Sequence, residues 1–100
     1  MTGSADIVNW GIVGLGWVAR DFVAPAMLRS PGSRIAACLG SSQAKSEAFA
    51  EQFDVTHAHA TLDQLLADPV LDAVYVALPN AMHHQAVLAC ARAGKHVLCE

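Results

Sequence analysis

Charged residues are scarce in this chain of 100 residues, because Asp, Glu, Lys and Arg together make up only 15% of the sequence. The six lysines and arginines are scattered and form no basic stripe, so nucleic acid is a poor candidate partner. No apolar run approaches the roughly 18 residues that a membrane-spanning helix needs. Residues 1–6 contain no basic segment leading into an apolar core, so they do not resemble a secretion signal. These absences predict a cytoplasmic protein with neither nucleic acid nor a membrane as partner.

Cysteine is also rare. Cys38, Cys90 and Cys99 are odd in number, lie far apart and form no Cys-x-x-Cys pair. We therefore expect them to be buried, unpaired thiols in a reducing compartment.

The five histidines do not have the spacing of a structural zinc site. His83 and His84 would point about 100° apart on a helix, which makes them a poor chelating pair. His57 and His59 can share one face of a strand. On spacing alone we predict no metal site. The chain also lacks a Gly-x-Ser-x-Gly elbow, so a nucleophilic hydrolase is not indicated.

Apolar residues make up 54% of the sequence and fall into short β-rich runs that alternate with helical stretches. This alternation predicts an α/β fold, with a parallel sheet covered by helices. Strands are expected at Ile7–Val13, Arg34–Gly40, Val55–His59, Ala73–Leu78 and His96–Cys99. Right-handed crossovers then give the strand order 3-2-1-4-5, a doubly wound sheet in which ligands bind where the order reverses, between the first and fourth strands.

Helices are expected between these strands. The first covers Trp17–Arg29, and its inner face is predicted to hold Val18, Phe22, Val23, Ala26 and Met27, with Pro25 causing a kink or an irregular turn. Ser41 or Ser42 can cap the second, which runs to Phe53, and Thr61 opens a short third helix through a capping box. The fourth covers Ala81–Ala93, with Asn80 as its cap and Gly94 just past its end.

A glycine turn links the first strand to the first helix. It reads Gly14-Leu15-Gly16-Trp17-Val18-Ala19, the pattern Gly-x-Gly-x-x-Ala between a strand and a helix. Gly14 permits the tight turn and Gly16 leaves the backbone open to a pyrophosphate, while Ala19 allows close packing of helix on strand. The helix start offers free N–H groups and a positive dipole end to phosphate. This context predicts a Rossmann-like dinucleotide site, although a tight turn of another α/β protein would look similar.

The end of the second strand predicts which dinucleotide binds. An NAD site usually has a carboxylate here for the ribose hydroxyls, but Gly40-Ser41-Ser42-Gln43-Ala44-Lys45 contains none. Serine hydroxyls and a lysine suit a 2′-phosphate, which favours NADP over NAD. The alternative is that Ser42 is only a helix cap and Lys45 only a solvated side chain.

Two further segments are more specific than the glycine turn. They are Ala77-Leu78-Pro79-Asn80-Ala81-Met82-His83 and Ala93-Gly94-Lys95-His96-Val97-Leu98-Cys99-Glu100. Together with the glycine turn they closely resemble the N-terminal domain of the Gfo/Idh/MocA family, over essentially the whole of Ile7–Glu100. The resemblance implies a nicotinamide oxidoreductase that acts on a carbinol or carbonyl of a sugar or polyol.

The resemblance also implies roles for single residues. Positions matching Leu78, Pro79, Asn80 and His83 line the cofactor, the last three at its nicotinamide end. Glu100 matches the first position of a Glu-Lys-Pro motif whose lysine contacts the cofactor and helps in proton transfer. That lysine and the family's C-terminal α+β substrate domain fall outside this sequence. We therefore expect residues 1–100 to be a partial Rossmann domain that holds no catalytic residue, binds the dinucleotide without turnover and self-associates, the parent protein being a homo-oligomer.

Other interpretations stay open on the sequence alone. A dinucleotide-sensing or scaffold module would keep the groove without catalysis. A domain for another nucleotide, such as S-adenosylmethionine, fits the glycine turn but not the Pro79-Asn80-x-x-His83 segment. Trp17 either sits at the mouth of the groove or packs against another domain.

Overall fold

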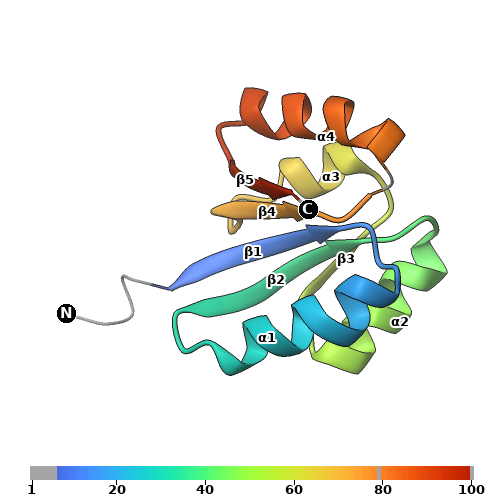
Figure 1. Cartoon of the computed structure of the whole chain (residues 1–100), viewed down its shortest axis with the longest axis vertical. Coiled ribbons are helices and arrows are strands. Elements are labelled where there is room, and N and C mark those ends of the chain that lie inside the picture. Colours follow the sequence, from blue (N-terminus) through green and yellow to red (C-terminus); the bar gives the residue numbers. More distant parts are fainter. Residues whose placement is uncertain (1–6, 79, 100) are drawn as a thin grey trace.

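The computed structural model describes residues 7–78 and 80–99, and of Asn80 and Ala81 it describes the backbone alone. Strands and helices alternate along this part of the chain (Figure 1). The strands are β1 (Val8–Val13), β2 (Ser33–Leu39), β3 (His57–His59), β4 (Ala73–Val76) and β5 (His96–Cys99). The helical segments are η2 (Ala19–Val23), α1 (Ala24–Arg29), α2 (Gln43–Phe53), α3 (Leu62–Leu66) and α4 (Asn80–Arg92). Every strand begins and ends within two residues of its predicted bounds.

The strands form one parallel sheet in the order β3-β2-β1-β4-β5, which confirms the predicted topology. β1 is the central strand and pairs with β2 on one side and β4 on the other. Its position follows from its sequence, because a run that is apolar on both faces is stable only between two layers of helices. The strand order reverses between β1 and β4, so their ends form the crevice expected in a doubly wound sheet.

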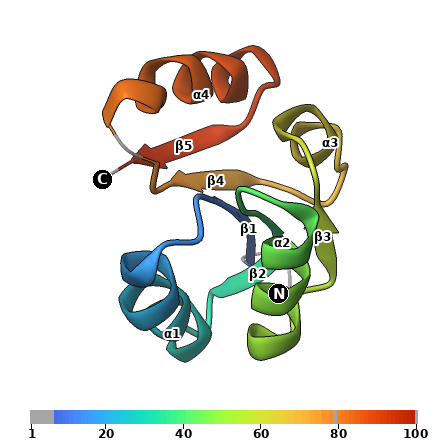
Figure 2. The same cartoon turned by 90° about the vertical axis from the view of Figure 1, so that its right-hand side faces the viewer.

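Two helical layers cover the sheet. α1 and α2 lie on one face, and α3 and α4 lie on the other (Figure 2). Successive strand residues point to opposite faces, so Ile12 packs into the core beneath α1 and α2 whereas Val13 packs into the core beneath α3 and α4. Phe49 and Val55 complete the first core, and Leu65 is a fully buried member of the second.

The first helix is irregular where Pro25 predicts it. η2 is a π-helical turn in which the N–H of Ala24 donates to the carbonyl of Ala19, five residues back. Pro25 follows at once and has no N–H for a regular α-helical bond. The wide turn makes the predicted inner face wrong for Phe22, which is 60% exposed, because burial follows the five-residue spacing of Ala19 and Ala24. Ala26 is exposed as well.

Helix ends match the predicted capping residues. The Ser42 Oγ accepts from the N–H of Lys45 at 3.2 Å, at the start of α2. The Thr61 Oγ1 accepts from the N–H of Gln64 at 3.1 Å, at the start of α3. Gly94 has a φ of +75° just after α4, a backbone conformation that side chains disfavour.

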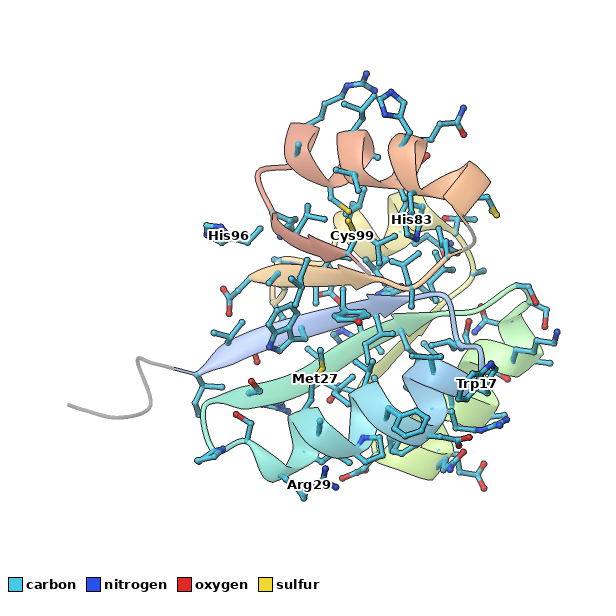
Figure 3. The ribbon with its side chains drawn as sticks, in the orientation of Figure 1. Trp17, Met27, Arg29, His83, His96 and Cys99 are labelled. Carbon is cyan, nitrogen blue, oxygen red and sulfur yellow. The ribbon has the colours of Figure 1, made fainter. Side chains whose placement is uncertain are left out.

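The thiols differ in exposure. Cys38 and Cys90 are buried and unpaired, as expected, but Cys99 is exposed. The prediction was wrong for Cys99 because β5 is the outermost strand of the described sheet, in which it pairs with β4 alone. Figure 3 shows Cys99 on this strand. Among the residues that the structure describes, no helix is long and apolar enough to cross a membrane.

Candidate functional site

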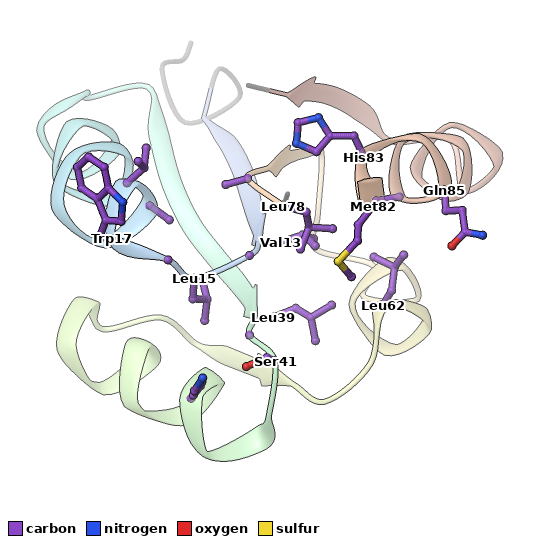
Figure 4. Close-up of a pocket in the computed structure, with 18 residues that line it drawn as sticks. Val13, Leu15, Trp17, Leu39, Ser41, Leu62, Leu78, Met82, His83 and Gln85 are labelled. Carbon is purple, nitrogen blue, oxygen red and sulfur yellow. The ribbon is translucent and has the colours of Figure 1, made fainter. Parts of the chain in front are cut away.

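A groove with a volume of about 810 Å³ opens at the edge of the sheet where β1, β2 and β4 end (Figure 4). Parallel strands bring their carboxyl ends to the same edge, and the reversal of strand order leaves a crevice there. The described lining residues come from these strand ends and from the helices that follow them: Val13, Gly14, Leu15, Gly16, Trp17, Val18, Ala19, Leu39, Gly40, Ser41, Lys45, Leu62, Ala77, Leu78, Met82, His83, Gln85 and Ala86.

Gly14 makes the tight turn after β1. Its φ is +97°, and its N–H donates to the carbonyl of Leu39 at 2.9 Å. A Cβ at this position would lie 2.7 Å from the carbonyl oxygen of Ala77, at the end of β4. Both the conformation and the space therefore require glycine, and the turn brings the ends of three neighbouring strands together.

Gly16 borders open space. A Cβ there would meet no atom of the described residues within 4 Å, in contrast to Gly14. The Gly16 carbonyl accepts from the N–H of Arg20 at 3.0 Å, so the helical turn begins directly after this glycine. Among the described residues, no side chain forms a capping hydrogen bond at Val18, the residue before η2. A ligand can thus approach the backbone of the turn closely, as a pyrophosphate must at a helix N-terminus.

The loop after β2 places Ser41 and Lys45 on the groove but not Ser42. The Ser42 hydroxyl caps α2 through its bond to the Lys45 N–H, and the Ser42 carbonyl accepts from the Ser46 hydroxyl at 3.1 Å. Of the three residues predicted to contact the ribose 2′-phosphate, the structure therefore places two, Ser41 and Lys45, on the groove.

Ser46 fixes the shape of this loop and was missed from the sequence. Its buried hydroxyl accepts from the N–H of Gly40 at 2.8 Å while it donates to the carbonyl of Ser42. One side chain thereby joins the end of β2 to the first turn of α2. The signal was present as a polar residue on the inner face of an amphipathic helix, where burial requires hydrogen-bonded partners.

His83 lies on α4 and points toward the sheet (Figure 3). Its Nε2 is buried and has no hydrogen-bond partner among the residues that the structure describes. Buried polar atoms are nearly always paired, so an unpaired imidazole nitrogen on the wall of a groove suits a polar ligand group. Pro79 and Glu100 lie outside the described residues, and so does the side chain of Asn80, including its predicted capping role.

An apolar wall borders the groove. Leu78 was predicted there, but Leu39, Leu62 and Met82 were not. Figure 4 shows Met82 and Leu62 on the same side of the groove. The topology could have indicated both, since Leu62 opens α3 and Met82 directly precedes His83 on α4. A mostly apolar lining with few polar groups is typical of a site for a small organic ligand or cofactor.

Trp17 stands at the rim of the groove, on the η2 and α1 side, facing the side that carries Met82 and His83 (Figure 4). Its side chain is 61% exposed. The Trp17 ring packs edge-on against Phe22, with ring centroids 5.7 Å apart. This position fits the predicted location at the mouth of the groove. The exposed face of the Trp17–Phe22 pair is equally compatible with the alternative prediction, contact with a further domain.

Comparison with known proteins gives consistent results. The chain is 38% identical over 95 residues to an uncharacterized oxidoreductase of Rhizobium meliloti, covering 95% of this chain and 28% of that protein. It is 36% identical over 92 residues to the 1,5-anhydro-D-fructose reductase of Ensifer adhaerens, covering 92% of this chain and 27% of the relative. The chain therefore spans little more than a quarter of the length of these curated relatives.

A solved structure shows the same fold. The 3-ketoreductase KijD10 of Actinomadura kijaniata, in complex with TDP-benzene and NADP, superimposes with a TM-score of 0.89 at 29% identity. The match covers 93% of this chain and 29% of that one. A family profile described as an oxidoreductase family with an NAD-binding Rossmann fold matches residues 8–100. The chain thus belongs to the Gfo/Idh/MocA oxidoreductase family and carries that family's NAD-binding Rossmann fold.

Proposed function

We propose that this groove binds a nicotinamide dinucleotide and that the chain is the cofactor-binding part of an oxidoreductase acting on CH–OH groups of sugars, polyols or related carbinols. The contrast between two glycines carries the proposal. A side chain at Gly14 would collide with the backbone of β4, whereas a side chain at Gly16 would enter empty space on the groove. The first glycine is required by the fold, and the second is explained by a ligand that approaches the backbone.

The polar groups at the end of β2 support NADP as the preferred dinucleotide. Ser41 and Lys45 line the groove there, and none of its described lining residues is Asp or Glu. A serine hydroxyl donates a hydrogen bond and lysine adds a positive charge, so both favour a phosphate on the 2′ position of the ribose. The solved relative that contains NADP has the same fold and supports this choice.

The residues present fit such a cofactor. When bound, a nicotinamide dinucleotide supplies the donor or acceptor of a hydride. Gly16 and the start of the helix receive phosphate, and Lys45 contributes charge. The Nε2 of His83, which has no partner among the described residues, offers one hydrogen bond to a polar group held beside α4. The proposed role of these residues is to bind and orient the dinucleotide, which is the part of catalysis that depends on holding reactants in place.

The substrate class rests on the relatives, one named as a 1,5-anhydro-D-fructose reductase and another as a 3-ketoreductase. Hydride transfer from a carbinol also needs a group that accepts the hydroxyl proton. We assign that group and the substrate pocket to the parent protein outside residues 1–100. Accordingly, residues 1–100 alone should bind the dinucleotide without turnover. Assembly of the parent as a homo-oligomer remains a prediction.

A single substitution separates binding from folding. Gly16→Val places a branched side chain in the open space of the groove, and we expect it to weaken NADPH binding by about tenfold or more in a calorimetric titration. Its free energy of unfolding should change by no more than about 0.5 kcal/mol, as for other open surface positions. Ala26→Val, at an exposed position of α1 away from the groove lining, serves as the matched control and should leave both quantities unchanged. Equal NADPH binding by all three proteins would refute the proposed site.

A further inference from the structure

Three side chains that can bind a metal ion meet at β3, an edge strand of the described sheet. His57 and His59 alternate along this strand and so point to the same face. Asp68 follows α3 and approaches them from the turn that leads to β4. None of the three lines the dinucleotide groove.

One oxygen of Asp68 contacts both imidazoles. The Oδ2 lies 2.5 Å from the Nδ1 of His57 and 3.1 Å from the Nε2 of His59. All three of these atoms lie within 4.8 Å of one another. Ligand atoms 2.0–2.2 Å from a tetrahedral zinc ion are about 3.3 Å apart, so only small side-chain movements separate this arrangement from a coordination site.

The surroundings hold the carboxylate in place. Asp68 Oδ1 accepts from the N–H of Val70 at 3.0 Å, a bond that orients a metal-binding carboxylate.

No lysine or arginine side chain pairs with this carboxylate within residues 7–78 and 80–99. The nearby Lys95 directs its Nζ to the backbone carbonyls of Leu71, at 2.9 Å, and Asp68, at 3.3 Å. The side chain of Asp68 is only 3% exposed, and its ion-pair partners in the described chain are the two histidines. A carboxylate buried this deeply normally pairs with a cation or coordinates a metal ion.

We propose that His57, His59 and Asp68 bind one divalent transition-metal ion of the zinc type. Two imidazoles and a carboxylate suit zinc, cobalt or nickel, whereas calcium and magnesium prefer oxygen ligands alone. His57 is 42% exposed, so an ion can enter from its side and a water molecule can occupy the fourth position. The ion would tie the edge strand β3 to the turn between α3 and β4, and it would stabilise the folded chain by binding to that state alone.

The sequence spacing did not reveal this site because its third ligand is supplied by the fold. His57 and His59 by themselves are a two-residue motif, and Asp68 is separated from them by a whole helix. Only the packing of α3 against β2 and β3 brings the carboxylate to the imidazoles.

The test is a calorimetric zinc titration of the protein without a polyhistidine tag, after treatment with a chelator. The exposed Cys99 is replaced in every sample by Cys99→Ser, because a free thiol binds zinc by itself. We expect one ion per chain and a rise in melting temperature on zinc addition. His57→Ala should weaken binding by roughly tenfold or more, since even supporting residues of metal sites contribute this much. This residue is partly exposed, so the variant should fold.

His96→Ala is the matched control, since His96 is an exposed histidine on β5. It should bind zinc as tightly as the Cys99→Ser protein that carries no histidine substitution. Asp68→Asn should bind weakly as well, and the His57→Ala result decides the question if the Asp68 variant does not fold. Cobalt in place of zinc should give a spectrum without a thiolate charge-transfer band. The proposal is overturned if the tag-free Cys99→Ser protein shows no saturable zinc binding, or if His57→Ala binds as tightly as His96→Ala.

Discussion

Gly14 at the end of β1 lies so close to Ala77 at the end of β4 that a Cβ on the glycine would stand 2.7 Å from the Ala77 carbonyl oxygen. The N–H of Ala77 in turn donates to the carbonyl of Val13 at 2.8 Å, so backbone hydrogen bonding between β1 and β4 continues as far as these two residues. The groove begins at that point. The stability of the fold and the shape of the ligand site are therefore determined by the same few backbone atoms.

Gly14→Ala should destabilise the protein more than Gly94→Ala does. Both glycines have positive φ, so both variants carry the strain of a side chain in the left-handed region, about 1 kcal/mol. Only Gly14 adds a collision with backbone, because a Cβ at Gly94 meets nothing within 4 Å. Urea unfolding should show a loss of about 3 kcal/mol or more for Gly14→Ala. Equal losses for the two variants would show that β1 and β4 separate more easily than their packing indicates.

Adjacent serines should have separable effects. Ser42→Ala removes the cap of α2 and should lower the free energy of unfolding by about 1 kcal/mol in urea denaturation. Ser41→Ala should leave stability within about 0.5 kcal/mol. In titrations with NADPH the order should reverse, since Ser41 lines the groove and the loss of a hydrogen bond to a charged group costs about 1.5 kcal/mol or more. If Ser42→Ala weakened NADPH binding more than Ser41→Ala, the serine that contacts the ligand would be Ser42 and not Ser41.

The buried thiol of Cys38 should make stability fall at high pH. Burial raises its pKa to about 11. Since this pKa lies above that of an unfolded thiol, about 8.5, the contribution to stability is complete below pH 8.5 and is lost as pH rises toward 11. The difference in unfolding free energy between the unaltered protein and Cys38→Ala should therefore shrink between pH 8 and 10.5. Cys99→Ala, at an exposed position, should show no such trend. A constant difference for Cys38→Ala would mean that its thiol ionises as readily in the folded state as in the unfolded one.

Periodicity predicted the sheet well because each strand is a short apolar run bounded by turn residues. The parallel order then followed from crossover handedness, and glycine spacing located the turn at Gly14 and Gly16. These features depend on neighbours in the sequence. The burial of Phe22 failed for a local reason that periodicity alone does not contain, because the π-helical turn before Pro25 changes the spacing of inward residues.

Features that depend on distant segments were the ones missed. Leu62 and Met82 reach the groove only because α3 and α4 cover the same face of the sheet. Asp68 meets His57 only through the packing of α3 against the sheet, and no short motif describes that packing. Sequence patterns indicated the backbone of the candidate site, and three-dimensional packing was needed to identify its walls.

The central proposal for this chain is that the groove binds a dinucleotide and prefers NADP. Calorimetric titration of the protein with NADPH and NADH in parallel tests this directly, with Lys45→Glu as a companion variant. We expect saturable one-to-one binding, tighter for NADPH, and a loss of that preference in Lys45→Glu, where a carboxylate repels the 2′-phosphate. A folded sample that binds neither dinucleotide would contradict the central claim.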